Sequence, residues 1–244
     1  MTLETLNLTK SFGGLCAVDD VSFAASTGEL TCITGPNGAC KTTVFNLLTG
    51  FYAPDAGRVL LDGRDITELS LAARAREGVT RTFQNIRLLD ELSALDNLTT
   101  AMHGELNGSL IDTLLPTRRR SQALAQAQTF AREQLVFLGL EAYADMPAGK
   151  MPYGARKSLE IARCLCMKPR LMLLDEPASG LNTQEAFELG RTIQQLNKSE
   201  IIIVVIEHNM ALVRQIADRV IHVEGGRVKY ALGQGEWLGQ AETD

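Results

Sequence analysis

A glycine-rich segment is the part of the sequence whose residue types most directly suggest chemistry. It consists of Gly35, Pro36, Asn37, Gly38, Ala39, Cys40, Lys41, Thr42 and Thr43. It lies between an apolar run and a predicted helix, so its backbone N–H groups and the positive helix end can converge on an anion. The segment predicts a phosphate-binding loop in which Lys41 reaches the outer phosphates of a nucleotide and the Thr42 hydroxyl holds Mg²⁺.

The loop departs from the pattern G-x-x-x-x-G-K-[ST] at one position, because Cys40 stands where the last glycine is expected. A side chain there crowds a backbone that should approach the β-phosphate closely. We therefore expect Cys40 to weaken nucleotide affinity or turnover. By itself, the segment also fits an ordinary glycine turn before a capped helix.

Two acidic residues, Asp175 and Glu176, follow the apolar run 171–174, which predicts a buried strand. Ligands of α/β sheets bind at the carboxyl ends of strands, so both carboxylates are expected beside the phosphate loop. Asp175 can join the magnesium shell, and Glu176 can act as a general base on the water that attacks the terminal phosphate. A solvated acidic turn before Pro177 is the alternative for this pair alone.

A histidine follows a third apolar run, residues 201–206, in the sequence Glu207-His208-Asn209. The same edge of the sheet should therefore carry His208. A lone histidine in such a place is more often structural. In company with the two preceding motifs, His208 is better interpreted as a polar contact to the γ-phosphate.

The surrounding pattern predicts strands and helices that position these groups. Strands are expected at residues 2–8, 17–24, 30–34, 57–61, 171–174 and 201–206, with a closing hairpin of 220–223 and 228–231; helices are expected at 41–49, 71–77, 121–138, 183–196 and 210–217. Gly50 is placed to cap the helix 41–49. Residues 85–167 have helical periodicity and predict an inserted helical subdomain, with a loop at 103–117 and a solvated helix start at 118–120.

Composition limits the function classes. A chain of 244 residues with 45% hydrophobic and 22% charged residues is typical of a folded globular protein. A formal net charge of -5 and a pI near 5.4 argue against nucleic-acid binding. The apolar run 201–206 is far shorter than the roughly 20 residues that cross a bilayer, and no secretory signal pattern opens the sequence. Five scattered cysteines suit reduced thiols, so a cytosolic location is expected.

The motifs occur in the order seen in ABC ATPases, and the resemblance extends over essentially the whole chain. It rests on the glycine-rich loop, Gln84, the segment Tyr153-Gly154-Ala155-Arg156-Lys157, Asp175-Glu176, Ser179-Gly180-Leu181-Asn182 and His208. Thr82-Phe83-Gln84-Asn85-Ile86-Arg87-Leu88 and Glu207-His208-Asn209-Met210 look most like the subfamily that serves branched-chain amino-acid importers. The resemblance implies an α/β fold: a P-loop NTPase core (residues 1–84 and 168–244 of one domain) with an N-terminal antiparallel β subdomain and an inserted α-helical subdomain.

The same resemblance implies roles for individual residues. Phe12 would stack on adenine, which the aromatic face permits. Gln84 would sense the metal and the membrane subunit, and His208 would orient the terminal phosphate. Tyr153 and Gly154 belong to the signature segment, which would complete the site of a second ATPase subunit. The usual signature begins Leu-Ser-Gly-Gly-Gln, whereas this chain has Met151-Pro152-Tyr153-Gly154-Ala155 and lacks the serine hydroxyl.

The resemblance implies an ATP- and Mg²⁺-dependent ATPase that powers an importer, on the cytoplasmic face of the cell membrane. Its partners would be an identical or related ATPase subunit, transmembrane permease subunits and, indirectly, an external solute-binding protein. A regulatory module that binds ATP and leaves turnover to its partner is the alternative, supported by Cys40 and Pro152. A third alternative is an ABC ATPase that acts on DNA or ribosomes. Such a protein would usually show a coiled coil, a tandem ATPase domain or a basic face, and none of these is visible in the sequence.

Overall fold

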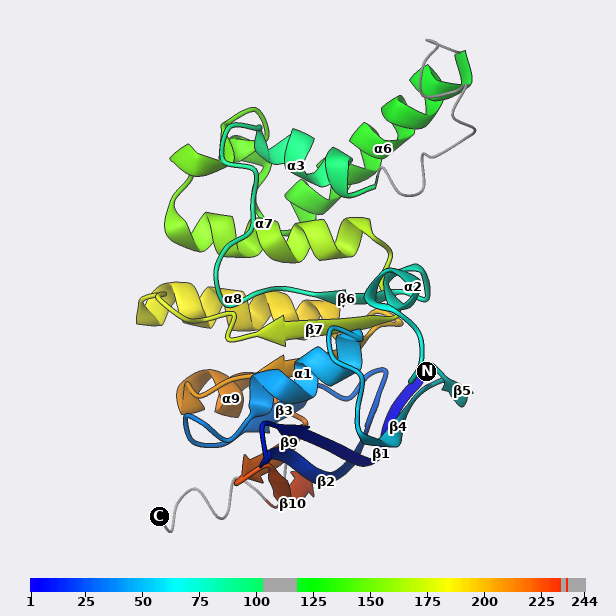
Figure 1. The fold of residues 1–244 in the computed structure, drawn as a ribbon. Helices are drawn as coiled ribbons and strands as arrows, with labels where there is room; N and C mark the ends of the chain where they lie inside the picture. Colours follow the sequence, from blue (N-terminus) through cyan, green and yellow to red (C-terminus); the bar gives the residue numbers. More distant parts are fainter. Residues whose placement is uncertain (103–117, 234–235, 237–244) are drawn as a thin grey trace. The chain divides into compact units, whose positions relative to one another are not determined.

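A computed structural model describes residues 1–102, 118–233 and 236 of the chain (Figure 1). The loop expected at residues 103–117 lies outside the described residues. The chain divides into two compact units. The first unit comprises Met1–Gln84 and Arg170–Asp244, and the second comprises Asn85–Pro169.

An antiparallel sheet with the strand order β2-β1-β4-β5 forms one layer of the first unit. Its strands are β1 (Thr2–Phe12), β2 (Leu15–Ser26), β4 (Ala56–Leu61) and β5 (Arg64–Asp65). The long β1–β2 hairpin buries Leu3, Leu8 and Val21 on its inner face. This alternation of buried and exposed positions is what one covered sheet face requires.

A six-stranded sheet with the order β10-β9-β3-β8-β7-β6 forms the centre of the same unit. The strands are β3 (Thr31–Thr34), β6 (Val79–Arg81), β7 (Leu171–Asp175), β8 (Ile202–Ile206), β9 (Arg219–Glu224) and β10 (Arg227–Gly233). All neighbours pair in parallel except β9 and β10, which form a hairpin. Strands β7 and β8 are fully buried, and their residues 171–174 and 202–206 are continuous apolar runs.

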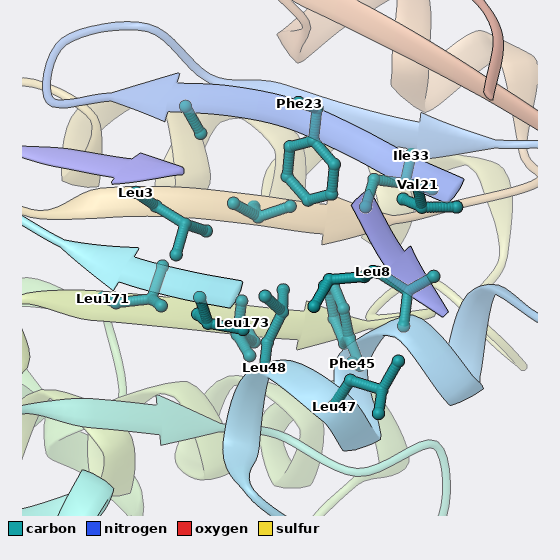
Figure 2. Packing of buried hydrophobic residues seen from close by; sticks show 14 of the residues in the cluster. Leu3, Leu8, Val21, Phe23, Ile33, Phe45, Leu47, Leu48, Leu171 and Leu173 are labelled. Carbon is teal, nitrogen blue, oxygen red and sulfur yellow. The ribbon is translucent and has the colours of Figure 1, made fainter. Parts of the chain in front are cut away.

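Helix α1 (Lys41–Thr49) contributes Phe45, Leu47 and Leu48 to a hydrophobic core that includes residues of both sheets, among them Leu3 and Leu171 (Figure 2). The remaining helices of the first unit are α2 (Leu71–Arg76), α8 (Thr183–Leu196) and α9 (Met210–Ile216). Helix α8 begins with a capping box between Asn182 and Glu185. Because α1 packs into this core, the glycine-rich loop that precedes it is joined to a firmly held helix.

The end of α1 is closed by Gly50, in the left-handed conformation at φ 75°, which confirms the predicted cap. The buried Arg74 guanidinium donates to the carbonyl oxygens of Leu47 and Leu48, and also to those of Thr67 and Leu69. Burial lowers the pKa of Arg74 to about 10. A cation at the C-terminal carbonyls stabilises the helix end through the helix dipole.

The second unit is helical and has its own hydrophobic core. It contains α3 (Ala94–Ala101), α6 (Arg118–Phe137) and α7 (Tyr153–Cys166), with short 3-10 helices η1 (Glu141–Tyr143) and η2 (Ala148–Lys150). Leu98 of α3, Leu135 of α6 and Leu159 of α7 meet in that core. The periodicity of residues 121–138 therefore reflects one face of α6, which ends one residue earlier than predicted.

Most predicted elements are present, with differences at their ends. Strand β1 continues to Phe12 instead of ending at Leu8, and two short strands, β5 and β6, were not predicted. Two or three residues are too few for a periodic pattern, and pairing with β4 and β7 defines these strands. Within the described residues, none of the helices combines the length and the apolar character needed to cross a bilayer.

Candidate nucleotide-binding and catalytic site

The glycine-rich loop turns sharply between β3 and α1. Gly35 has φ 142°, Gly38 has φ 84°, and Cys40 has φ 64°. A side chain at Gly35 would place its Cβ 2.0 Å from the carbonyl oxygen of Val223 in β9, so only glycine fits there. Cys40 adopts a left-handed conformation that costs an L-residue roughly 1–2 kcal/mol. Its backbone conformation thus gives a second reason, besides phosphate approach, why glycine suits this position.

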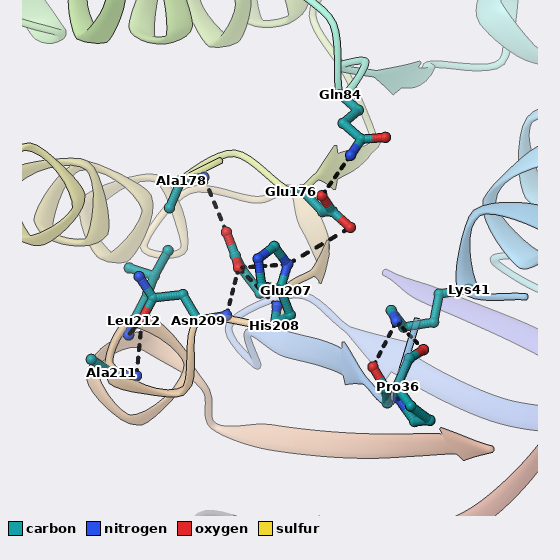
Figure 3. A network of polar contacts seen from close by, with 11 residues as sticks. Pro36, Lys41, Gln84, Glu176, Ala178, Glu207, His208, Asn209, Ala211 and Leu212 are labelled. Atoms are coloured by element: carbon teal, nitrogen blue, oxygen red, sulfur yellow. Dashed lines mark hydrogen bonds and ion pairs between the residues drawn. The ribbon is translucent and has the colours of Figure 1, made fainter. Parts of the chain in front are cut away.

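Lys41 is held across the loop by the loop's own backbone (Figure 3). Its ammonium nitrogen donates to the carbonyl oxygens of Gly35 at 2.7 Å and Pro36 at 2.9 Å. Burial lowers the pKa of Lys41, an effect that the negative charges of Glu176 and Asp175 oppose. The side chain is therefore a preoriented cation at the mouth of the loop.

Asp175 ends β7, as predicted, and forms a buried ion pair that the sequence did not indicate. Arg81 Nη2 lies 2.6 Å from Asp175 Oδ2, and the two side chains are 7% and 4% exposed. The same guanidinium donates to Asn46 Oδ1 on α1 at 2.6 Å. The rings of Phe45 and Phe83 lie 5.5 and 5.4 Å from the guanidinium carbon. Arg81 thereby fixes Asp175 to the helix that carries Thr42.

Glu176 follows in a left-handed conformation at φ 46°, which is unusual for a residue with a side chain and is typical of functional turns. Its N–H donates to the carbonyl oxygen of Ile206 at the end of β8. Gln84 Nε2 donates to Glu176 Oε2 at 2.9 Å, and His208 Nδ1 lies 3.7 Å from Glu176 Oε1. Three separate parts of the sequence thus meet at one carboxylate (Figure 3).

Gln84 reaches that position because the chain after β6 continues alongside β7. The Thr82 N–H donates to the carbonyl oxygen of Leu173, and the Thr82 hydroxyl accepts the N–H of Asp175. The sequence analysis did not predict the short strand β6, although the pairing of β6 with β7 is what brings Gln84 next to Glu176. The only sequence signal for Arg81 is its position directly before Thr82-Phe83-Gln84.

Three other predicted site residues belong to other elements. Phe12 ends β1, is 41% exposed, and contacts the ring edge of Tyr52 with 5.1 Å between centroids. Tyr153 and Gly154 form the first turn of α7 in the helical unit, where Tyr153 is 45% exposed. The helix begins at Tyr153. The side chain of the N-cap residue, Pro152, caps no amide of that turn.

The residues present fit a magnesium nucleotide by their donor chemistry. Thr42, Asp175 and Gln84 offer hydroxyl, carboxylate and amide oxygens, which are the hard ligands that Mg²⁺ prefers. The loop amides, the N-terminus of α1 and the Lys41 ammonium suit phosphate oxygens. A parallel sheet with this loop after β3 and acidic residues at the end of β7, with β8 between the two strands, defines the class of P-loop ATPases.

Comparison with known proteins gives the particular family. The model of the ABC transporter family matches residues 18–179. The chain is 41% identical over 225 residues to the high-affinity branched-chain amino acid transport ATP-binding protein BraF of Pseudomonas aeruginosa, covering 92% of this chain and 88% of that protein. It is 42% identical to LivG of Escherichia coli, with the same coverage. The crystal structure of MJ1267 in its ADP conformation, an ATP-binding cassette, superposes with a TM-score of 0.86 at 30% identity, covering 100% of this chain and 96% of that chain.

The chain therefore belongs to the ABC transporter family and is an ATP-binding, ATP-hydrolysing subunit of that family. The predicted fold class is confirmed: an ABC ATPase cassette with an antiparallel β subdomain and a helical region. The regulatory and DNA- or ribosome-associated alternatives are less consistent with these relatives.

Proposed function

We propose that this chain powers an importer of branched-chain or related amino acids. The observation that carries the proposal is the convergence of Gln84 and His208 on Glu176, which directly follows β7. The relatives BraF and LivG are named for branched-chain amino acid transport, which supports the substrate class. Substrate choice itself would lie with membrane subunits and an external binding protein.

In the proposed reaction, the amides of residues 35–43 and the Lys41 ammonium bind the phosphates of ATP. The Thr42 hydroxyl, Asp175 and Gln84 would hold Mg²⁺, which when bound neutralises charge on the terminal phosphates. Phe12, which is 41% exposed, would stack on adenine.

Glu176 is proposed to accept a proton from the attacking water. Its Oε2 already accepts the Gln84 amide, and His208, which is exposed, lies beside its Oε1. His208 would orient the terminal phosphate while Glu176 takes the proton. A base already hydrogen-bonded to Gln84 loses less entropy on reaching a reactive geometry, which favours this division of roles.

We further propose that two cassettes act together and that Tyr153 and Gly154 of one complete the site of the other. The position of Tyr153 and Gly154 at the start of α7 supports this proposal, because a helix N-terminus favours a phosphate. The partner can be an identical or a related subunit. The pair would associate with permease subunits at the cytoplasmic face of the membrane.

The experiment that tests the catalytic proposal uses Glu176→Gln in the purified protein or its membrane complex. ATP hydrolysis should fall by at least about 100-fold, since a general base is lost, while ATP binding persists. Hydrolysis at the wild-type rate in Glu176→Gln would show that Glu176 is not the general base. Wild-type protein that binds ATP without steady hydrolysis, even with its partner, would favour the regulatory alternative, for which the strained Cys40 is the supporting observation.

A further inference from the structure

A buried glutamate behind the catalytic edge has no role in the reaction described above. Glu207 directly follows β8 and is 0% exposed, although a carboxylate pays a large desolvation penalty in a protein core unless it is well hydrogen-bonded. Its own N–H donates to the carbonyl oxygen of Ile33, which anchors its backbone to β3. The burial of the Glu207 carboxylate therefore requires hydrogen-bond partners inside the protein.

Three backbone N–H groups donate to the Glu207 carboxylate and compensate for its burial. Oε1 accepts the N–H of Ala178 at 3.0 Å, and Oε2 accepts the N–H groups of His208 at 2.8 Å and Asn209 at 2.9 Å (Figure 3). Carboxylates that accept several backbone N–H groups form strong, charge-assisted hydrogen bonds. One side chain thus joins two turns of the catalytic edge.

The two turns are those that carry the proposed catalytic groups. Ala178 lies in the turn that Glu176 begins, and that turn is closed by a hydrogen bond from the Ser179 N–H to the Glu176 carbonyl oxygen. The other turn carries His208, whose neighbour Asn209 caps α9 by accepting the N–H groups of Ala211 and Leu212. Glu207 connects both turns, and its Oε2 also lies 4.0 Å from His208 Nδ1.

We propose that Glu207 is a positioning residue that fixes His208 relative to Glu176 by holding the backbone of both turns. The inference rests on the proposed roles of Glu176 and His208. It predicts that a carboxylate, with two acceptor oxygens, is needed here. A glutamine has one acceptor oxygen and one amide nitrogen, so at least one buried N–H would lose its partner or face another donor.

The test compares Glu207→Gln with Glu200→Gln, a matched change at an exposed glutamate before β8. The first readout is ¹H–¹³C NMR of the imidazole rings, which is simple because the chain has three histidines. Signals are assigned with His208→Gln and His222→Gln. His222 serves as an internal reference, since its ring stacks on Tyr230 and accepts or donates at Thr34.

The expected result is a shift or broadening of the His208 signal in Glu207→Gln, with the His222 signal unchanged and no change in Glu200→Gln. Hydrolysis should show a kcat lower by about tenfold and an ATP KM within about twofold of wild type, because the change affects alignment more than binding. An unchanged His208 signal, or equal changes at His208 and His222, would overturn the proposal.

A second variant covers the case in which Glu207→Gln does not fold. Glu207→Asp keeps the charge and both oxygens but is one methylene shorter, so it cannot reach all three amides. The NMR signals of His208 and His222 in this variant then test the proposal in the same way.

Failure of the proposed catalytic roles would be seen separately, because His208→Gln and Glu176→Gln would then leave hydrolysis intact. The NMR outcome for Glu207 does not depend on that result.

Discussion

The phosphate loop and the edge formed by Asp175, Glu176 and His208 are built in different ways. In the loop, backbone groups position the site: glycine conformations determine the path of the chain, and carbonyl oxygens accept the Lys41 ammonium. At the edge, side chains position the site: Arg81 pairs with Asp175, and Gln84 donates to Glu176. Glu207 accepts the backbone N–H of His208. A backbone-built site is sensitive to added atoms, whereas a side-chain-built site is sensitive to lost partners.

The strongest test of this difference is the loss of one partner in the buried ion pair. Arg81→Met should destabilise the fold by about 3–5 kcal/mol, because Asp175 is left as a buried, uncompensated charge. The free energy of unfolding in urea measures this. Arg64→Met is the matched control, since Arg64 forms an exposed pair with Glu77 and should cost about 0–1 kcal/mol.

A double substitution sharpens the result. Arg81→Met combined with Asp175→Asn removes both charges, so part of the lost stability should return. If the two losses simply added, the ion pair would not be the cause.

The loop should respond to added atoms instead. Gly35→Ala should cost about 3 kcal/mol or more, because its Cβ overlaps the Val223 carbonyl oxygen and its φ is unfavourable. Gly38→Ala adds a Cβ in open space at φ 84°, so only the conformational cost of about 1–2 kcal/mol applies. Chemical denaturation of both variants checks the order, and equal costs would contradict the steric explanation.

A smaller effect is expected from removing a side chain from the loop. Cys40→Gly should raise stability by about 1 kcal/mol, because glycine accepts the left-handed conformation without strain, and should also raise ATP affinity or turnover. Cys40→Ala keeps a Cβ and removes only the thiol, so it should show neither gain. Nucleotide titration and thermal unfolding of the two variants measure this; a gain in Cys40→Ala would assign the defect to sulfur.

The smallest effect concerns the charge of Lys41. Burial lowers its pKa in the folded state, so below that pKa the folded protein carries the cost of a desolvated ammonium. As the pH rises through the folded pKa toward the ordinary value of 10.5, the unfolded chain binds more protons and the cost is released. The unfolding free energy of wild type should therefore rise relative to that of Lys41→Met as the pH approaches 10.5. A falling difference would reverse the sign.

Much of the site was predictable because its motifs carry their own context. The apolar runs before residue 35 and before Asp175 are the buried strands β3 and β7, and Gly50 closes α1 as expected. Glycines 225 and 226 both have positive φ, as the predicted hairpin requires. The roles assigned to the individual site residues, Phe12, Tyr153 and Gly154 among them, remain predictions.

Arg81 and Glu207 could not be assigned in this way. An arginine beside an aromatic residue, or a glutamate before a histidine, has no periodic signature, and both residue types are usually exposed. Their burial follows from pairing over long sequence separations: β6 with β7, and β8 with both β3 and β7.

By itself, the sequence determined the class of fold, the phosphate loop, the two acidic residues and the histidine, because local pattern and strand ends dictate them. The tertiary structure decided how these groups are held: which cation neutralises Asp175, which amide binds Glu176, and which carboxylate joins the two turns. The reason is physical. Hydrophobic periodicity is a local property of the chain, whereas a buried polar group is defined by partners that only folding brings within hydrogen-bonding distance.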